Sequence, residues 1–380
     1  MSGPSTHGLG GHDLPALLFG DRMARLQAAL EPAGVEALLV TALPNVRYLT
    51  GFTGSAGVLL VHGHGARLVT DGRYRTQVHE QVDAAGLAPV VELTVGGVQA
   101  QRRALADAAA GAAVRRLGLE ADHVTWGAQR RWAEELSAVE LVPTGGVVEE
   151  LRQVKDAGEL ARMERAAAIA DAALAEILAL VAPGRREDEV ALALDTAMRR
   201  LGAEDRAFET IVASGPNAAK PHARPTGRAM AAGDPVVVDF GAIFDGYRSD
   251  MTRTFCVGGM PTGTLARVFE VVGSAQAAGV AAVRAGVHSA QVDAACRELI
   301  AAAGWGEAFE HGTGHGVGLD IHEAPSVAPG STAILAPGVV VTVEPGVYLP
   351  GTGGVRVEDT VVVTEDGCRT LTGFPKDIAA

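Results

Sequence analysis

The sequence is poor in cysteine, in aromatic residues and in clustered positive charge. Its three cysteines (Cys256, Cys296 and Cys368) lie far apart and lack the CxxC or Cys/His spacing of a zinc knuckle, so we interpret them as reduced thiols of a cytoplasmic protein. The formal net charge is −13 and the basic residues are scattered. This pattern excludes the basic footprint of a nucleic-acid-binding protein.

Long hydrophobic runs are also missing. No segment reaches the roughly 18 apolar residues that a membrane span needs, and the opening MSGPSTHGLGGH has neither a basic n-region nor an apolar h-region. We therefore expect a soluble chain with no membrane partner, whose residues 1–12 are disordered. Since about half of the 380 residues are apolar, the chain can form two cores, and two domains are expected.

The pattern of the chain changes near residue 150. Over 13–148, short apolar runs alternate with helical stretches, which predicts a smaller α/β domain. Over 149–380, helical patterns come first, including one long helix over 151–181. Two further helices and several strands follow, so the second domain is predicted to be α+β with a hairpin-rich sheet.

A hairpin places two acids close together. The pair Asp245-Gly246 lies between alternating segments and predicts a type I′ turn. Counting back from that turn, Gly241 pairs with Asp250, so Asp239 becomes a diagonal neighbour of Asp250 at about 7 to 8 Å between Cα atoms. Two carboxylates at that separation can hold a common ion, although a lone hairpin aspartate is more often a surface acid.

Two glutamates follow strand-like runs. Glu344 ends VVVTVE, before Pro345 and Gly346 break the strand, and Glu358 shares a strand face with Arg356 in GVRVEDTVVV. Either glutamate alone would more often belong to a solvated sheet face. Four converging carboxylates, however, repel one another unless cations neutralise them, and two divalent ions match four negative charges.

The stretch HGTGHGVGLDIHE contains three histidines. Glycines alternate at 312, 314, 316 and 318, which favours an extended segment with one side open to another backbone or a ligand, and His315 points to the other side. The run is not a dinucleotide-binding GxGxxG, because Val317 replaces the third glycine. His311 and His322 could be helix-spaced zinc ligands, but four alternating glycines make a helix unfavourable.

The acids and one histidine occur in a recognisable order. The motifs VDFG, SDMTRTF, HGTGHGVGLDIHE, TVEPGVY and GVRVEDT resemble those of the pita-bread metallopeptidases, and most closely the Xaa-Pro peptidases prolidase and aminopeptidase P. The segments LPNVRYLTGFTGS (43–55) and VTDGRY (69–74) resemble the creatinase-type N-terminal domain of these enzymes. The resemblance implies an α+β pita-bread catalytic domain over 149–380, preceded by a creatinase-like α/β domain over 13–148.

The resemblance also implies a metal site with two divalent ions per subunit. It makes Asp239 a ligand of one ion and Asp250 and Glu358 bridges between the two, while His315 and Glu344 complete the second ion. The ions would lie about 3.5 to 4 Å apart and lower the pKa of a shared water. Glu344 would also take the proton from that water. Mn(II) suits so oxygen-rich a site best, and Zn(II), Co(II) or Fe(II) are possible.

Other residues match cleft positions of the family. His222, in NAAKPHARPT, would contact the substrate and assist proton transfer at the scissile imide, and His322 would hydrogen-bond the developing oxyanion. His311 would line the proline pocket. Tyr348 and Arg356 match further cleft residues.

The implied activity is hydrolysis of the bond between an N-terminal residue and proline in a small peptide. We expect a dipeptidase (prolidase), partly because the compact N-terminal region has no insertion that could build an extended peptide site. Arg47, in the expected loop 43–55, is a candidate partner for the carboxylate of an Xaa-Pro dipeptide. Arg47 as a solvated loop residue is an equally open interpretation. The alternative is an aminopeptidase P that acts on longer peptides.

Family members that lack this activity differ from this chain in their metal-binding residues. Creatinase works without metal, and some family members are non-catalytic binding proteins; both have lost ligands that this chain retains. A non-enzymatic pita-bread binding protein is therefore a distant alternative. The N-terminal domain in these enzymes overhangs a cleft, often that of a partner subunit, so a homodimer is expected.

Overall fold

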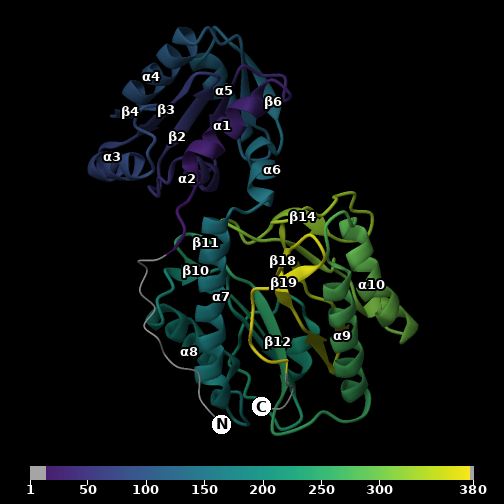
Figure 1. Ribbon diagram of the computed structural model, residues 1–380. Helices are drawn as coiled ribbons and strands as arrows, with labels where there is room; N and C mark the ends of the chain where they lie inside the picture. The colour runs from purple at the N-terminus through teal and green to yellow at the C-terminus, as the bar shows by residue number, and fades with distance from the viewer. Residues whose placement is uncertain (1–13, 377–380) are drawn as a thin grey trace. The chain divides into compact units, whose positions relative to one another are not determined.

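The chain folds into two compact units, which are described separately below. The computed structural model describes residues 14–376 (Figure 1), so the disorder predicted for residues 1–12 lies outside the described residues. Leu17–Gln153 form one unit, and the described residues from Val154 onward, with those before Leu17, form the other. None of the helices in residues 14–376 is long and apolar enough to cross a membrane.

The N-terminal unit is built on one mixed sheet with the strand order β4-β3-β2-β1-β5-β6. Its strands are β1 (Ala37–Val40), β2 (Val58–His62), β3 (Gly65–Thr70), β4 (Val91–Val95), β5 (Arg116–Glu120) and β6 (Glu140–Thr144). Its helices are α1 (Phe19–Leu30), α2 (Leu43–Thr50), α3 (Arg75–Ala84), α4 (Val98–Gly111), α5 (Trp126–Glu135) and α6 (Val147–Gln153), with a 3₁₀ turn at Gly72–Tyr74. Leu39 and Leu60 of the sheet pack with Leu105 of α4 in its core. The predicted α/β character is confirmed.

The loop expected over residues 43–55 is wrong for its first eight residues, which form helix α2. Pro44 occupies the first turn, where proline suits a helix, and the helix ends at Gly51, whose left-handed backbone lets its N–H donate to the carbonyl of Arg47. The carboxylate of Glu120 accepts the N–H groups of Thr41 and Ala42 just before the helix, at 2.6 and 2.8 Å. An anion at this end favours the helix dipole.

Within the described residues, the second unit combines four main helices with several small sheets. The helices are α7 (Ala157–Ile177), α8 (Glu187–Arg200), α9 (Gly263–Ala282) and α10 (Ser289–Ala302), with 3₁₀ turns η2 (Leu178–Leu180), η3 (Gly215–Ala219) and η4 (Gly306–Ala308). The strands are β7 (Asp205–Arg206), β8 (Ile211–Ser214), β9 (Pro235–Phe240), β10 (Ala242–Phe244), β11 (Tyr247–Arg248), β12 (Met251–Cys256), β13 (Gly314–Gly316), β14 (Glu323–Val327), β15 (Val340–Val343), β16 (Gly346–Leu349), β17 (Gly353–Arg356), β18 (Asp359–Val363) and β19 (Cys368–Thr370). The predicted α+β character is confirmed.

Two helix pairs cover two groups of strands. Helices α7 and α8 share one apolar core with β8, β9 and β12, in which Leu174 and Leu194 pack with Phe240. Helices α9 and α10, which lie side by side in Figure 1, share a second core with β15 to β18, including Val272 and Val361. The candidate site residues lie in or next to strands of both packing groups.

The single helix predicted over residues 151–181 is wrong, because α6 and α7 are separate helices. Asp156 caps α7 through a capping box, in which its side chain accepts the N–H of Glu159 and its own N–H donates to the Glu159 carboxylate. Just before this cap, the N–H of Lys155 donates to the carbonyl of Gly338 at 2.9 Å. The local capping box begins α7, and the long-range hydrogen bond of Lys155 keeps the residues between the two helices out of a helical conformation.

The predicted hairpin register is confirmed. Asp245 and Gly246 both have positive φ, 45° and 77°, as a type I′ turn requires. Strand β9 pairs with β12 so that Asp239 faces Thr252, which leaves Asp250 as its diagonal neighbour. The hairpin is divided between two three-stranded sheets, β11-β10-β7 and β12-β9-β8, at Gly241. A Cβ atom there would lie 1.9 Å from the carbonyl oxygen of Ser249.

Gly241→Ala is therefore expected to lower the free energy of unfolding by about 1 to 3 kcal/mol, because the backbone around the added methyl group has to move. Gly273→Ala, in α9, is the matched control, since an added Cβ atom there meets nothing within 4 Å. The control should raise stability by about 0.5 to 1 kcal/mol, because alanine is the better helix former. Denaturant unfolding followed by circular dichroism measures both; an unchanged midpoint for Gly241→Ala would contradict the close approach.

Candidate metal centre and substrate cavity

One cavity of about 600 Å³ in the second unit collects the residues that the sequence singled out. Each comes from a strand or from the residue next to one: Asp239 in β9, Asp250 before β12, His315 in β13, Glu344 after β15 and Glu358 before β18. The cavity wall also includes His222, His311, His322 and Arg356. Residues more than 100 positions apart in the sequence thus line the same space.

The tightest group is formed by Asp250, His315 and Glu358. One ligand atom from each lies within 4.8 Å of the others, a spacing that could hold a metal ion. Nε2 of His315 lies 3.6 Å from a carboxylate oxygen of Asp250 and 3.5 Å from one of Glu344. The other ring nitrogen, Nδ1, donates to the carbonyl of Gly316 at 3.0 Å, which leaves the Nε2 lone pair directed at the acids.

Burial makes this group of charges unfavourable without a cation. Desolvation, with repulsion from the neighbouring acids, raises the pKa of Asp250 and that of Glu358 well above their usual values. Desolvation also raises the pKa of Glu344 to about 8. It lowers the pKa of His315 to about 4, so the imidazole is neutral and its lone pair is free.

Two buried oxygens in the cluster have unmet bonding capacity. Oδ1 of Asp239 and Oε1 of Glu358 have no hydrogen-bond partner among the residues that the structure describes. Buried polar atoms are nearly always satisfied, and an ion is one of the recognised explanations for an exception. Orphaned carboxylate oxygens beside a neutral imidazole form a hard, oxygen-rich donor set, so the residues fit divalent cations.

Threonines that the sequence analysis did not single out hold the acids in place. Thr252 donates its hydroxyl to Glu358 at 2.7 Å and accepts Nε–H of Arg356 at 3.1 Å. The hydroxyl of Thr342 accepts the backbone N–H of His315 at 3.1 Å and lies 3.5 Å from Glu344. The strand period of two could have identified both, because each lies two residues from an acid of the cluster.

Glycines let the strands that carry these residues approach one another. A Cβ atom at Gly314 would lie 2.0 Å from the carbonyl oxygen of Thr342, and one at Gly316 would lie 2.3 Å from that of Ala324. The extended conformation predicted for this run is confirmed for β13. Gly314 therefore lets the backbone beside His315 lie against β15, which Glu344 follows, and Gly316 lets it lie against β14.

Arg356 is the buried counter-charge of the cavity. Its guanidinium donates to Asp239 at 2.6 Å and to the hydroxyl of Tyr348 at 2.8 Å, and the Tyr348 hydroxyl in turn donates to Nε2 of His311 at 2.9 Å. Burial raises the pKa of Tyr348 to about 12 and lowers the pKa of His311 to about 4, so the phenol keeps its proton and the imidazole is neutral. This chain of hydrogen bonds fixes one wall of the cavity.

His322 and His222 lie on the more exposed part of the wall. The His322 ring packs edge-on against His315, with 4.3 Å between ring centroids. Desolvation lowers the pKa of His322, which favours the neutral ring. The next residue, Glu323, forms a buried ion pair with Lys155 at 3.0 Å. This pair anchors the backbone beside His322.

The structure places some of the residues differently from what the sequence predicted. Within the described part of the chain, the cavity wall includes His311 and Arg356 but not Tyr348, which lies behind them. The continuous strand expected through Arg356 and Glu358 is wrong: β17 ends at Arg356 and β18 begins in another sheet, with Glu358 at the junction. Arg47 is a half-buried residue of α2 in the N-terminal unit.

Apolar side chains complete the cavity and were not predicted. Phe208, Ile211 and Ile321 line it together with Pro221. They follow no spacing that a single sequence would reveal, because they come from three separate segments. Their presence beside the acids makes the cavity suitable for a substrate with an apolar ring.

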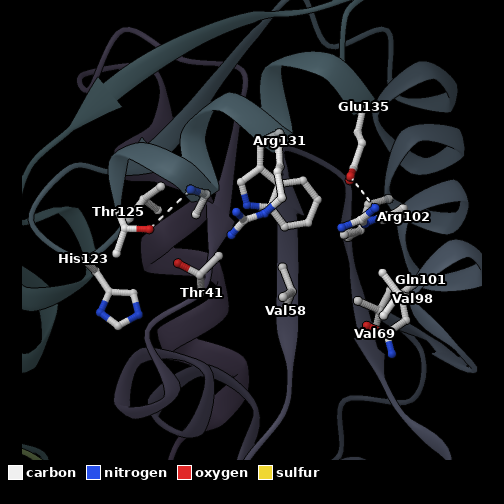
Figure 2. Close-up of a pocket in the computed structure, with 14 residues that line it drawn as sticks. Thr41, Val58, Val69, Val98, Gln101, Arg102, His123, Thr125, Arg131 and Glu135 are labelled. Atoms are coloured by element: carbon white, nitrogen blue, oxygen red, sulfur yellow. Dashed lines mark hydrogen bonds and ion pairs between the residues drawn. The ribbon is translucent and has the colours of Figure 1, made fainter.

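The N-terminal unit has a second cavity, of about 380 Å³, between α4 and α5 (Figure 2). Its floor includes Val58 and Val69, and its polar end includes Thr41 and His123. Glu135, the acid in its described lining, is already paired with Arg102 at 2.7 Å. This cavity therefore lacks the carboxylates that make the first one a candidate metal centre.

Comparisons with known proteins agree with a metal centre in the second unit. Residues 161–365 match metallopeptidase family M24, and residues 22–154 match the creatinase/prolidase N-terminal domain. The chain is 42% identical to an uncharacterized peptidase of Bacillus subtilis, over 94% of this chain and 99% of the relative.

Solved structures give the same result. An Xaa-Pro dipeptidase from Bacillus anthracis superimposes with a TM-score of 0.90 at 39% identity, covering 95% of this chain and 100% of the other. An X-Pro aminopeptidase from Thermotoga maritima superimposes with a TM-score of 0.84 at 32% identity, covering 93% and 100%. The chain therefore belongs to metallopeptidase family M24 and, with its creatinase/prolidase N-terminal domain and pita-bread catalytic domain, to the prolidase and aminopeptidase P group.

Proposed function

We propose that this metallopeptidase hydrolyses the bond between an N-terminal residue and proline, with Xaa-Pro dipeptides as its main substrates. The observation that carries the proposal is the convergence of four carboxylates and a neutral histidine on one cavity that also has apolar walls. Similarity to both an Xaa-Pro dipeptidase and an X-Pro aminopeptidase supports cleavage of the bond before proline. It does not distinguish dipeptide from longer substrates, so the preferred length has to be argued from the cavity.

Five residues would hold two divalent cations in each subunit: Asp239, Asp250, His315, Glu344 and Glu358. Among these ligands, Asp250 and Glu358 have desolvated carboxylates that repel one another, and two divalent cations would neutralise them. When bound, such ions polarise the scissile carbonyl and lower the pKa of a water molecule. Mn(II) is the favoured ion, because four of the five ligands are carboxylates, and Zn(II), Co(II) or Fe(II) are alternatives.

The chain's own side chains would then carry the remaining steps. Glu344 accepts the proton of the attacking water, and the neutral His322 donates an N–H group to the oxyanion that develops at the scissile carbonyl. His222 assists proton transfer to the imide nitrogen that leaves. His311, held by Tyr348, forms one side of the proline pocket.

A purely binding role is disfavoured by the ligand set. A binding protein has no need to bury like-charged groups at a desolvation cost, yet Asp250 and Glu358 are 4% and 2% exposed. The enzymatic function accounts for these buried acids directly, since they would hold the cations that the hydrolysis requires.

Asp250→Ala and Glu358→Ala are expected to abolish metal binding and activity, whereas His322→Ala should keep its metal and lose rate. Removing one oxyanion donor costs about 100- to 1000-fold in kcat. Metal content by plasma emission spectrometry and kcat on Ala-Pro separate the two classes. If His322→Ala lost as much metal as Glu358→Ala, the proposed division of roles would be wrong.

The preference for dipeptides is tested by comparing Ala-Pro with Ala-Pro-Ala. The wild type should hydrolyse Ala-Pro with the higher kcat/KM. If Arg47 contacts the substrate carboxylate, Arg47→Ala should raise KM for Ala-Pro and affect Ala-Pro-Ala less. Efficient cleavage of the tripeptide by the wild type would make the protein an aminopeptidase P instead.

A homodimer is proposed as the assembly, on the resemblance to enzymes in which the N-terminal domain overhangs a partner's cleft. Light scattering at micromolar concentration should give about twice the 38.9 kDa mass of the chain. A monomeric mass would contradict this assembly.

A further inference from the structure

The wall of the catalytic cavity has a second arginine, Arg224, in addition to Arg356. Arg224 lies in the segment that follows η3 and is two residues after His222. Its guanidinium pairs with Glu209 at 3.0 Å, and the two side chains are 80% and 51% exposed. The cavity thus has buried acids at its floor and an exposed ion pair in its wall.

Arg356 is not available for a new anion. Its side chain is 3% exposed and already donates to Thr252, Asp239, Tyr348 and the carbonyl of Pro221. Binding a substrate carboxylate there would break several buried hydrogen bonds, which is costly. His311 is neutral because burial lowers its pKa to about 4, so it brings no positive charge either.

Arg224 has the opposite properties. Exposed ion pairs contribute little to stability, so its bond to Glu209 can be exchanged for another carboxylate at small cost. A guanidinium binds a carboxylate through two parallel hydrogen bonds, which fixes its orientation as well as its charge. Among the described residues of the cavity wall, which include no lysine, Arg224 is the cation that is free to change partner.

The proposed reaction limits the direction in which a substrate can lie in the cavity. The scissile carbonyl has to reach the acids at the floor, so the group that follows the proline ring is directed away from the floor. His222, which the proposed function puts beside the scissile imide, lines the same cavity as Arg224 and lies two residues before it in the sequence. A longer peptide carries a neutral amide at this point, where a dipeptide carries a full negative charge.

We propose that Arg224 selects dipeptides by binding the free carboxylate of the proline residue, and that Glu209 is its partner in the absence of substrate. This inference rests on the proposed Xaa-Pro peptidase function and names the residue that sets its substrate length. Arg224 is a specificity determinant of the catalytic unit itself. The carboxylate of Glu209 competes with the substrate carboxylate for the guanidinium of Arg224.

The test compares Ala-Pro with its C-terminal amide, Ala-Pro-NH2, which differs in the single negative charge. Arg224→Gln should raise KM for Ala-Pro about tenfold with kcat within about twofold, and should leave both constants for the amide unchanged. Glu209→Gln should act in the opposite direction and lower KM for Ala-Pro, because it removes the competing carboxylate. Arg267→Gln is the matched control, because Arg267 is an exposed arginine of α9. It should change neither kcat nor KM for either substrate.

A second readout does not depend on turnover. Proline should inhibit the wild type competitively and more strongly than prolinamide, and Arg224→Gln should abolish that difference. Equal effects of Arg224→Gln on dipeptide and amide, or a loss of discrimination in Arg47→Ala with none in Arg224→Gln, would overturn the role of Arg224. If the wild type cleaved neither substrate in the presence of any of the proposed metals, the proposed function would fail, and this inference with it.

Discussion

The mutual repulsion of four carboxylates in one partly buried space is the constraint on which the rest of this structure depends. Asp250 and Glu358 lie almost out of contact with solvent, and burial and repulsion raise the pKa of each. Such a group is stable only when cations or protons neutralise it. The buried oxygens of Asp239 and Glu358 that have no hydrogen-bond partner among the described residues, together with the neutral His315, favour neutralisation by cations over neutralisation by protons.

The fold meets this constraint by ending or interrupting strands at the cluster. Asp250 and Glu358 lie directly before strands and Glu344 directly after one, so their side chains leave the regular ladder and converge. Glycines remove the side chains that would keep these strands apart, because a Cβ atom at Gly314 would lie only 2.0 Å from the carbonyl oxygen of Thr342. Threonine hydroxyls then orient the acids. The helix pairs on either side supply the apolar cores that hold the strands in this arrangement.

Local rules explain what could be predicted from the sequence. The type I′ turn at Asp245-Gly246 determines the register of its hairpin, and register alone brings Asp239 close to Asp250. Alternating glycines correctly indicated an extended β13. Resemblance to a family supplied the order of the ligands, which no single motif would have established.

Other features depend on contacts between distant segments, and the sequence did not reveal them. Helix α2 was missed because its eight residues are too few for a clear helical period, and Glu120, more than 70 residues away, stabilises its start. Arg356 and Glu358 do lie close together, as predicted, but they do not share a strand face, because the chain changes sheets between them. The ion pair of Arg224 with Glu209 joins two irregular segments that have no pattern of their own.

The most direct test of the account is a calorimetric titration of metal-free protein with Mn(II), followed by thermal unfolding of the same samples. The account predicts two bound ions per chain, a higher unfolding temperature as the second ion binds, and Ala-Pro hydrolysis that follows occupancy. The same titration of Glu358→Ala should lose both the binding and the stabilisation. Binding of fewer than two ions by the wild type, or full activity in the metal-free protein, would contradict the claim that paired cations neutralise the buried acids.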